Sequence, residues 1–363
     1  MKCGRNARER LRRLRVAVFA LVCSPLVVAG AAGAAGASAI KWVDQPVSFE
    51  AGGLTIFATF RHPVADRDAV PGVLLIAGSG PTDRNGNSPL ETGTVDTIKT
   101  LADWLSEDGV ASLRYDKLGS GQTGLGSYAL DVDAIGIKPF EQESLAALEF
   151  LAKQKGVDDA RLGVFGHSEG ALFALLLATG HAGKAPPIHA LGLFEPLSLR
   201  YLSLITVQLR AQVAAERRAG EITNSLAATV DTTLAKAVKN LRATGTVSPG
   251  LPYGLDSLLN PATAKFLHGA DKFDPKRLAA SLARRTPVIV TCSTADSQVS
   301  CAQVQRIVQG LHEAGASTQF VPLTGVDHVL KVDPTGSPAN YTKRLPFSPV
   351  LKSALRTFVE QNL

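Results

Sequence analysis

Alternating apolar and polar positions mark the beginning of the folded part of this chain. Residues 47–50 and 54–60 alternate in this way and flank Gly52 and Gly53. A period of two lets one face of a strand contact a core, and adjacent glycines provide the positive φ that a tight hairpin turn requires. The pattern therefore predicts an N-terminal β-hairpin.

Short runs that are apolar on both faces follow the hairpin, beginning with residues 73–77. Such runs suit central parallel strands, because helices cover both faces of a parallel sheet. Segments with helical periodicity lie between them, and this alternation predicts an α/β fold with a mostly parallel, doubly wound sheet. The expected strands are 73–77, 110–115, 161–165, 188–194, 287–292 and 318–323. The expected helices are 97–107, 140–155, 169–179, 301–314 and 351–363.

The alternation stops within residues 197–285. Segments 197–219 and 222–243 look helical, and no clear strand pattern is present. Insertions at this level of a doubly wound sheet commonly cover an active site. We expect a helical cap insertion over 197–285, with residues 40–196 and 286–363 as the two parts of one core. A separate helical domain without a role in the site is the alternative.

Residues 1–39 differ in charge from everything that follows. Seven of the 38 basic residues but only one of the 32 acidic residues lie there, so the net charge of +6 belongs to this leader. A basic start, an apolar stretch over 16–28 and the small residues A-S-A at 37–39 are typical of a secretory signal peptide. We therefore expect export to the periplasm or the medium after cleavage. An uncleaved leader would be a membrane anchor, because residues 16–40 carry no charge.

The body of the chain after the leader is electrically neutral. Nucleic-acid binding depends on clustered basic residues, so no nucleic-acid partner is expected. A hydrophobic fraction of 45% supports a sizeable core, and a charged fraction of 19% argues against long disordered tails. The composition carries no signal for an oligomeric state.

The strongest chemical signal is the motif G-x-S-x-G at residues 166–170. It lies between the expected strand 161–165 and the expected helix 169–179, which is the strand–turn–helix context of a nucleophile elbow. The sharp turn exposes the serine hydroxyl above the sheet, near a helix N-terminus whose partial positive charge favours an oxyanion. We predict that Ser168 is a nucleophile.

A serine nucleophile requires a base, and the base requires an acid to orient it. His328 and Asp296 each follow a late strand, and ligand sites collect at the carboxyl ends of strands in open α/β sheets. The order Ser, Asp, His is that of α/β-hydrolases. We predict His328 as the base and Asp296 as the acid, with Glu195, at the end of the strand 188–194, as the competing acid.

Two other histidines are less suitable bases. His312 falls inside an expected helix and is predicted on its surface. His167 precedes the nucleophile, but its side chain is expected to point elsewhere on the turn.

The Gly-Ser-Gly-Pro sequence at 78–81 follows the first apolar strand. Such a loop can supply one backbone N–H of an oxyanion hole, from Gly80 or Ser79, while Glu169 supplies the other. The sequence at 119–124 matches G-x-G-x-x-G, but no helix pattern opens behind it, as a dinucleotide site requires. The reaction expected here needs neither a metal ion nor an organic cofactor.

Two cysteines, Cys292 and Cys301, remain after the leader. Exported proteins fold in an oxidising compartment, where such a pair can form a disulfide. Cys292 ends the strand before Asp296 and Cys301 opens the next helix, so the bond would close a short loop around the acid. Two buried free thiols are the alternative. Zinc is not expected, because no Cys-x-x-Cys motif or histidine cluster accompanies them.

The chain resembles the bacterial α/β-hydrolases of the serine aminopeptidase-like and lysophospholipase-like group, especially their exported esterases. The sequences GSGPTDRNGN at 78–87 and RYDKLGSG at 114–121 carry the resemblance together with the elbow, Asp296 and His328. It covers nearly all of the chain after the leader except the cap.

Two positions depart from that group, which has aspartate in place of Asn85 and arginine in place of Leu118. Both lie away from the triad, so the departures concern loop packing. The resemblance implies that Arg114 and Asp116 are scaffold for the oxyanion loop.

The residues together predict a serine hydrolase that cleaves a small-molecule carboxylic ester through an acyl-enzyme. A peptidase or amidase with the same triad is the alternative, and it would need an acidic pocket for the amino terminus of its substrate. A non-catalytic binding protein is a weaker hypothesis, because all three triad positions are filled.

Overall fold

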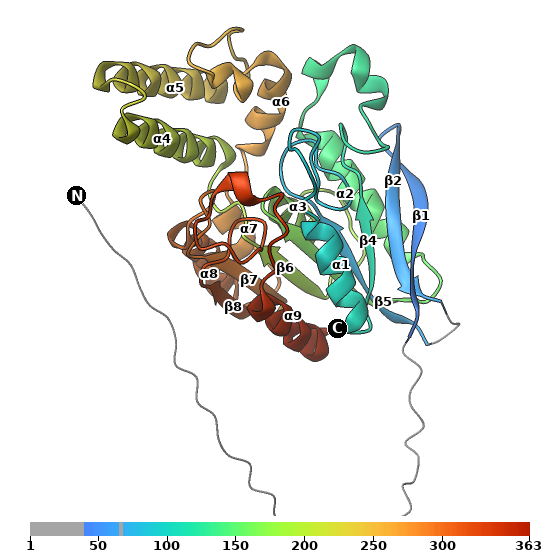
Figure 1. Ribbon diagram of the computed structural model, residues 1–363. Helices are drawn as coiled ribbons and strands as arrows, with labels where there is room; N and C mark the ends of the chain where they lie inside the picture. Colours follow the sequence, from blue (N-terminus) through green and yellow to red (C-terminus); the bar gives the residue numbers. More distant parts are fainter. Residues whose placement is uncertain (1–39, 65–67) are drawn as a thin grey trace, which may run out of the picture. The chain divides into compact units, whose positions relative to one another are not determined.

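The computed structural model describes residues 40–64 and 68–363, which fold around one eight-stranded sheet (Figure 1). The predicted signal peptide, residues 1–39, lies outside the described residues. The strands are β1 (Trp42–Ala51), β2 (Leu54–Pro63), β3 (Val70–Ile76), β4 (Ala111–Tyr115), β5 (Val157–His167), β6 (Ala190–Phe194), β7 (Pro287–Ser293) and β8 (Ser317–Leu323). Their spatial order is β1-β2-β4-β3-β5-β6-β7-β8.

The predicted N-terminal hairpin and the predicted parallel sheet are both confirmed. β1 pairs antiparallel with β2 around a two-residue turn in which Gly52 and Gly53 have positive φ. β2 also pairs antiparallel with β4, and every other pair in the sheet is parallel. The parallel strands β3 to β8 therefore end at the same edge of the sheet.

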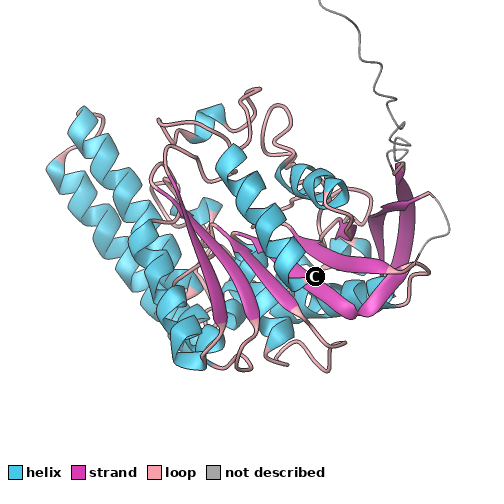
Figure 2. Cartoon of the chain, turned by 90° about the horizontal axis from the view of Figure 1, so that it is seen from below, coloured by secondary structure: helices cyan, strands magenta, loops and turns pink. Residues whose placement is uncertain are grey.

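Helices cover both faces of the sheet, so each strand contributes to two cores (Figure 2). Val73 and Leu75 of β3 face α1 and α9, whereas Leu74 and Ile76 belong to the opposite core, with α2, α3 and α8. The helices are α1 (Thr97–Glu107), α2 (Ile137–Ala152), α3 (Glu169–Ala178), α4 (Tyr201–Ala219), α5 (Asn224–Thr244), α6 (Pro261–Ala270), α7 (Pro275–Ala280), α8 (Cys301–Ala314) and α9 (Pro349–Asn362), with short 3₁₀ turns η1 (Gly126–Leu130), η2 (Val132–Ala134), η3 (Leu255–Ser257) and η4 (Pro338–Asn340).

The segment between β6 and β7 contains four helices. α4 and α5 form a helical pair that projects from the strand ends, and α6 contacts α4, α5 and η2 (Figure 1). α7 packs instead against α3 and α8 in the layer beside the sheet. The sequence pattern did not predict α6 or α7, which are short helices that begin with a proline behind an Asn260 or Asp274 cap. No helix among the described residues is long and apolar enough to cross a membrane.

Candidate active site

The G-x-S-x-G motif forms the turn between β5 and α3. Ser168 has φ 54° and ψ −116°, a strained conformation for a residue with a side chain. The flanking glycines make this turn possible, because a Cβ on Gly166 would lie 2.2 Å from the Gly170 backbone. A Cβ on Gly170 would lie 2.2 Å from the carbonyl oxygen of Ile76. The turn therefore holds Ser168 between the ends of β3 and β5.

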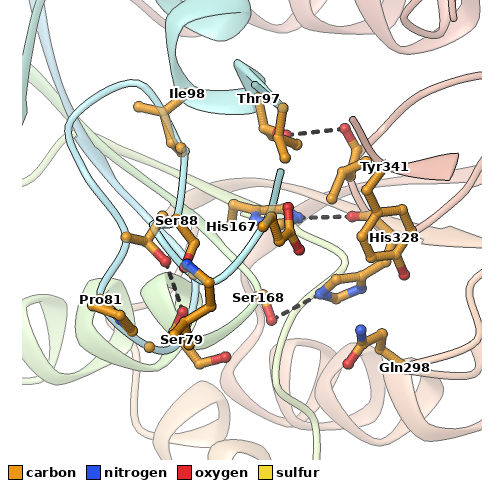
Figure 3. A pocket seen from close by; sticks show the side chains of 18 residues that line it. Ser79, Pro81, Ser88, Thr97, Ile98, His167, Ser168, Gln298, His328 and Tyr341 are labelled. Carbon is orange, nitrogen blue, oxygen red and sulfur yellow. Dashed lines mark hydrogen bonds between the residues drawn. The ribbon is translucent and has the colours of Figure 1, made fainter. Parts of the chain in front are cut away.

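The structure brings Ser168, His328 and Asp296 into one hydrogen-bonded chain. His328 Nε2 lies 3.0 Å from Ser168 Oγ, and His328 Nδ1 lies 2.7 Å from Asp296 Oδ2. Figure 3 shows the Ser168 hydroxyl pointing at the His328 imidazole. Because a carboxylate only accepts hydrogen bonds, Nδ1 carries the proton and Nε2 is free to accept the serine proton.

The loop after β7 fixes the position of the Asp296 carboxylate. Oδ1 accepts hydrogen bonds from the backbone N–H groups of Gln298 and Val299 at 2.7 and 2.9 Å. Burial alone would raise the pKa of Asp296, but His328 and the two N–H groups lower it below its ordinary value. The carboxylate is thus ionised at neutral pH and can stabilise a charged imidazole.

A disulfide spans the same loop. Cys292, near the end of β7, is bonded to Cys301, the first residue of α8, and their Cα atoms are 5.0 Å apart. The bond closes the segment that contains Asp296.

His167 is not the base, but its side chain does not point away from the site as the sequence analysis expected. Its Nε2 donates a hydrogen bond to the carbonyl oxygen of His328 at 2.7 Å, and the two rings lie 5.0 Å apart (Figure 3). Burial and the neighbouring His328 lower the pKa of His167 to about 3, so it is neutral. His167 therefore supports the backbone of His328. The sequence did not reveal this role because residues 167 and 328 become neighbours only in the folded chain.

The second candidate acid, Glu195, lies behind Asp296 rather than beside His328. It follows β6, is fully buried, and its carboxyl is within hydrogen-bonding reach of Asp296. Both acids weighed in the sequence analysis thus meet at one point. We call Asp296, His328, His167 and Glu195 the triad cluster.

Charged side chains hold the loop at 78–87. Arg84 forms an ion pair with Asp116 at 2.5 Å, and its backbone N–H also donates to that carboxylate. Arg114 donates to Asn85 at 3.1 Å and pairs with Asp44 at 2.9 Å. Arg114 and Asp116 thus occupy the scaffold positions that the resemblance implies.

The glycine-rich loop at 119–124 also serves packing. A Cβ on Gly121 would lie 2.2 Å from Asp116 Cγ, so the glycine allows the loop to approach that carboxylate. A 3₁₀ turn, η1, follows the loop where a dinucleotide site needs an α-helix. Within residues 40–64 and 68–363, no group of three or more His, Cys, Asp or Glu side chains could hold a metal ion.

A buried ion pair lies on the other side of Ser168. Lys117 donates to the carbonyl oxygen of Gly78 and pairs with Glu169 Oε1 at 3.0 Å, and Tyr201 donates to Glu169 Oε2. Glu143 accepts from the backbone N–H of Leu118 at 2.8 Å, and burial raises the pKa of Glu143 to about 8. We call Lys117, Glu169, Tyr201 and Glu143 the lysine cluster. No motif in the sequence predicts it, because its members come from four distant segments.

Two cavities meet at Ser168. The histidine-side cavity, of about 280 Å³, is lined by His328, His167, Tyr341 and the loop at 78–91 (Figure 3). The cap-side cavity, of about 440 Å³, lies beneath α4 and α6 and contains Glu169. The predicted oxyanion donors Ser79 and Gly80 line both cavities.

Comparison with solved structures identifies the fold. Est1E from Butyrivibrio proteoclasticus, solved with ferulic acid bound, is 17% identical with a TM-score of 0.53 over 87% of this chain and 98% of that chain. An acetyl xylan esterase from Paenibacillus sp. R4 is 14% identical with a TM-score of 0.52 over 89% of each chain. An acylaminoacyl peptidase from Pyrococcus horikoshii is 14% identical with a TM-score of 0.53, over 89% of this chain but 42% of that chain. No protein-family model and no curated protein matches the sequence. The chain has the α/β-hydrolase fold.

Proposed function

We propose that this protein is a serine hydrolase that cleaves carboxylic esters, as an exported esterase of the serine aminopeptidase-like and lysophospholipase-like group. The hydrogen-bonded chain from Ser168 through His328 to Asp296 carries the proposal. Ser168 Oγ attacks the ester carbonyl carbon while His328 Nε2 takes its proton. The tetrahedral oxyanion accepts hydrogen bonds from the N–H groups of Glu169 and of Gly80 or Ser79.

Collapse of this intermediate completes the first step. The C–O bond to the alcohol breaks as His328 returns the proton to the leaving oxygen, and the acyl group stays on Ser168. A water, deprotonated by His328, then attacks the acyl-enzyme and releases the acid. Asp296 stabilises the imidazolium in both steps, because its carboxylate remains ionised.

An ester fits the cavities better than a peptide with a free amino terminus. Such a peptide would place an ammonium group next to the acyl carbon and would need an unpaired carboxylate there. Glu169 is the only acidic residue among the described residues that line the cap-side cavity, and Lys117 already pairs with it. Glu91 lines the histidine-side cavity instead, so no unpaired carboxylate among the described residues lines the cap-side cavity, and this supports the ester.

We also propose that the enzyme acts outside the cytoplasm. The leader has the three regions of a signal peptide, and the Cys292–Cys301 disulfide suits an oxidising compartment.

Two assays test the proposed reaction. A fluorophosphonate probe should label the wild-type enzyme and fail to label a Ser168→Ala variant. The enzyme should hydrolyse p-nitrophenyl acetate and leave an aminoacyl p-nitroanilide largely intact. Faster cleavage of the anilide would favour the peptidase, and absence of labelling would contradict a nucleophilic Ser168.

A further inference from the structure

The two cavities at Ser168 differ in the groups that they contain. His328 lines only the histidine-side cavity, whereas Lys117 and Glu169 line only the cap-side cavity. The bottom of both is formed by Ser168 and the loop residues Ser79 and Gly80. An ester bound at Ser168 must therefore extend one of its two ends into each cavity.

The proton transfer decides which end goes where. His328 Nε2 must deliver a proton to the leaving oxygen, and such a transfer needs hydrogen-bonding distance. The leaving alcohol consequently lies on the side of Ser168 that His328 occupies. The acyl group, which remains bonded to Ser168, extends to the opposite side.

The two cavities also differ in the polarity of their linings, and this difference agrees with the orientation just described. The cap-side cavity is bounded by apolar side chains of α4, α6 and α2, including Leu204, Ile205, Phe266 and Phe140. Its buried charges, Lys117 and Glu169, are paired with each other. The histidine-side cavity is smaller and combines apolar side chains such as Leu90 and Ile98 with the carboxylate of Glu91 and hydroxyl groups, those of Thr82, Ser88, Thr97 and Tyr341, while Gln298 lines both cavities.

We propose that the natural substrate is an ester of an apolar acid with a compact, polar alcohol. The acyl chain occupies the cap-side cavity, where each buried methylene adds to transition-state binding. The alcohol occupies the histidine-side cavity. This assignment rests on the proposed esterase function and adds the orientation and chemical class of its substrate.

A pair of isomeric esters tests the orientation with the wild-type enzyme. In 2-hydroxyethyl octanoate the apolar end is the acyl group, and in octyl glycolate the same apolar end is the alcohol. We expect kcat/KM to be at least about tenfold higher for the octanoate. In that ester several methylenes lie in the apolar cap-side cavity, whereas in the glycolate they would have to enter the histidine-side cavity. Equal kcat/KM values, or a preference for the glycolate, would overturn the assigned orientation of the substrate but not the proposed esterase function. Failure to hydrolyse p-nitrophenyl acetate as well would overturn the proposed function.

Two matched variants fill one cavity each. Ile205→Trp narrows the cap-side cavity, and Ser88→Trp narrows the histidine-side cavity. Ile205→Trp should lower the ratio of kcat/KM for an octanoate ester to kcat/KM for the acetate ester of the same alcohol about tenfold or more. It should leave the dependence of kcat/KM on the size of the alcohol unchanged. Ser88→Trp should change only the dependence of kcat/KM on the alcohol. The reverse pattern would place the acyl group on the histidine side.

A different observation concerns Glu195. Its carboxyl is fully buried behind Asp296, and its backbone φ of 44° is unusual for a residue with a side chain. Thr291 of β7 accepts a hydrogen bond from the Glu195 N–H at 3.0 Å and donates one to Oε1 at 3.2 Å. The other oxygen, Oε2, receives no hydrogen bond from the described residues.

Two carboxyl groups in contact can form a hydrogen bond only when one of them carries a proton. Asp296 already accepts from His328 and from two backbone N–H groups, all of which favour its charged form. Glu195 has fewer donors, the Thr291 hydroxyl and the Ser293 backbone N–H, and no cationic partner among them. Burial and the charge of Asp296 raise the pKa of Glu195 well above its ordinary value, which places the proton on Glu195.

We infer that Glu195 is a positioning residue whose protonated carboxyl donates a hydrogen bond to Asp296. This bond extends the chain Ser168–His328–Asp296 by one member and orients the carboxylate that holds His328. The other titratable groups around Asp296 are His328, His167 and Tyr341.

Two substitutions of similar volume separate this role from packing. Glu195→Gln keeps a donor toward Asp296 and should retain kcat within about threefold. Glu195→Met keeps the volume but has no donor, and should lower kcat about tenfold, the effect of one hydrogen bond to a charged group. Without that donor Asp296 holds a protonated His328 more strongly, so the acidic limb of the kcat/KM profile should move to higher pH in the Met variant only.

Two results would overturn the inference. A Met variant with wild-type kcat and pH profile would make Glu195 a packing residue. A Gln variant as damaged as Asp296→Asn would mean that a charged Glu195 is needed. Infrared spectroscopy provides a test that does not depend on the folding of the Met variant. Wild-type enzyme at neutral pH should show a protonated carboxyl C=O band that Glu195→Gln lacks, and identical spectra would contradict the inference.

Discussion

The triad cluster and the lysine cluster flank the same serine, are both buried, and contain similar kinds of side chains, yet they do different things. In the triad cluster, His328 Nε2 has a free lone pair facing Ser168, so a proton can move between them. In the lysine cluster, Lys117 and Tyr201 both donate to Glu169, and Lys117 also holds the carbonyl oxygen of Gly78. His328 can therefore exchange a proton with Ser168, whereas the hydrogen bonds of Lys117 and Tyr201 hold Glu169 and the Gly78 backbone in place. Glu143, whose Oε1 has no hydrogen-bond partner among the described residues, keeps a proton of its own because burial raises its pKa to about 8.

The largest expected effect is the loss of activity when Ser168 or its partner His328 is replaced. Ser168→Ala and His328→Ala should each lower kcat about 10⁶-fold, because members of a triad act as one unit. Thermal unfolding of both variants should resemble that of the wild type. A double variant much slower than either single variant, or more than about one per cent residual activity in either, would contradict the pairing. His312→Ala, on the exposed face of α8, is the control.

Replacing the acid should have the next largest effect. Asp296→Asn keeps the shape but favours the wrong tautomer of His328, so kcat should fall about 10⁴-fold. Steady-state kinetics of the Asp296→Asn and Glu195→Gln variants, measured side by side, decide which acid orients His328. A larger loss in the Glu195 variant would reverse their roles.

Breaking the lysine cluster should affect folding first. Lys117→Met leaves Glu169 buried without its ion-pair partner and should lower the free energy of unfolding by about 3–5 kcal/mol. Tyr201→Phe, which removes one hydrogen bond to the same carboxylate, should cost about 1–3 kcal/mol. Urea unfolding measures both. Wild-type stability in Lys117→Met would show that the two clusters do not differ in the proposed way.

The disulfide should contribute a smaller amount near the triad cluster. Closing so short a loop stabilises the folded chain by about 2–3 kcal/mol, so a Cys292→Ser/Cys301→Ser variant should unfold at lower urea concentration. Both cysteines lie in the tryptic peptide 286–306, so the bond should appear as a mass lower by two hydrogens than that of the reduced peptide and as resistance of both thiols to alkylation. Alkylation of both thiols without prior reduction would mean that the bond is absent.

Glu143 should affect stability in a way that appears as a change with pH. Its pKa is raised from 4.5 to about 8, so the folded protein keeps a proton that the unfolded chain releases. Stability should therefore fall as pH rises between about 4.5 and 8. Glu143→Gln carries no such proton, and its stability relative to wild type should increase over the same interval. Parallel unfolding curves at pH 5 and pH 8 would contradict the assignment.

The fold and the candidate nucleophile could be predicted because both depend on patterns in local sequence. Ser168 lies in a strand–turn–helix motif that needs no distant residue to be recognised. Asp296 and Glu195 could not be ranked with the same certainty, since both end adjacent parallel strands and their side chains converge. Lys117 lies in the segment 114–121 that carries the resemblance, but nothing in the sequence pairs it with Glu169, and Tyr201 gave no signal. They lie in separate segments, and Tyr201, the first residue of α4, meets Glu169, the first residue of α3, only in the folded chain.

The way in which α4–α7 join the sheet has a consequence for how such an enzyme can diverge. The insertion leaves β6 just after Glu195 and returns at Pro287, and β6 and β7 are hydrogen-bonded neighbours through Leu191 and Val288. Because β6 and β7 are parallel, the insertion leaves at one edge of the sheet and must return to the opposite edge, and α7 makes that return while packed against α3 and α8. Evolution, or a protein engineer, could therefore exchange the projecting helices α4 and α5 while α7 and the segments that carry Ser168, Asp296 and His328 keep their places.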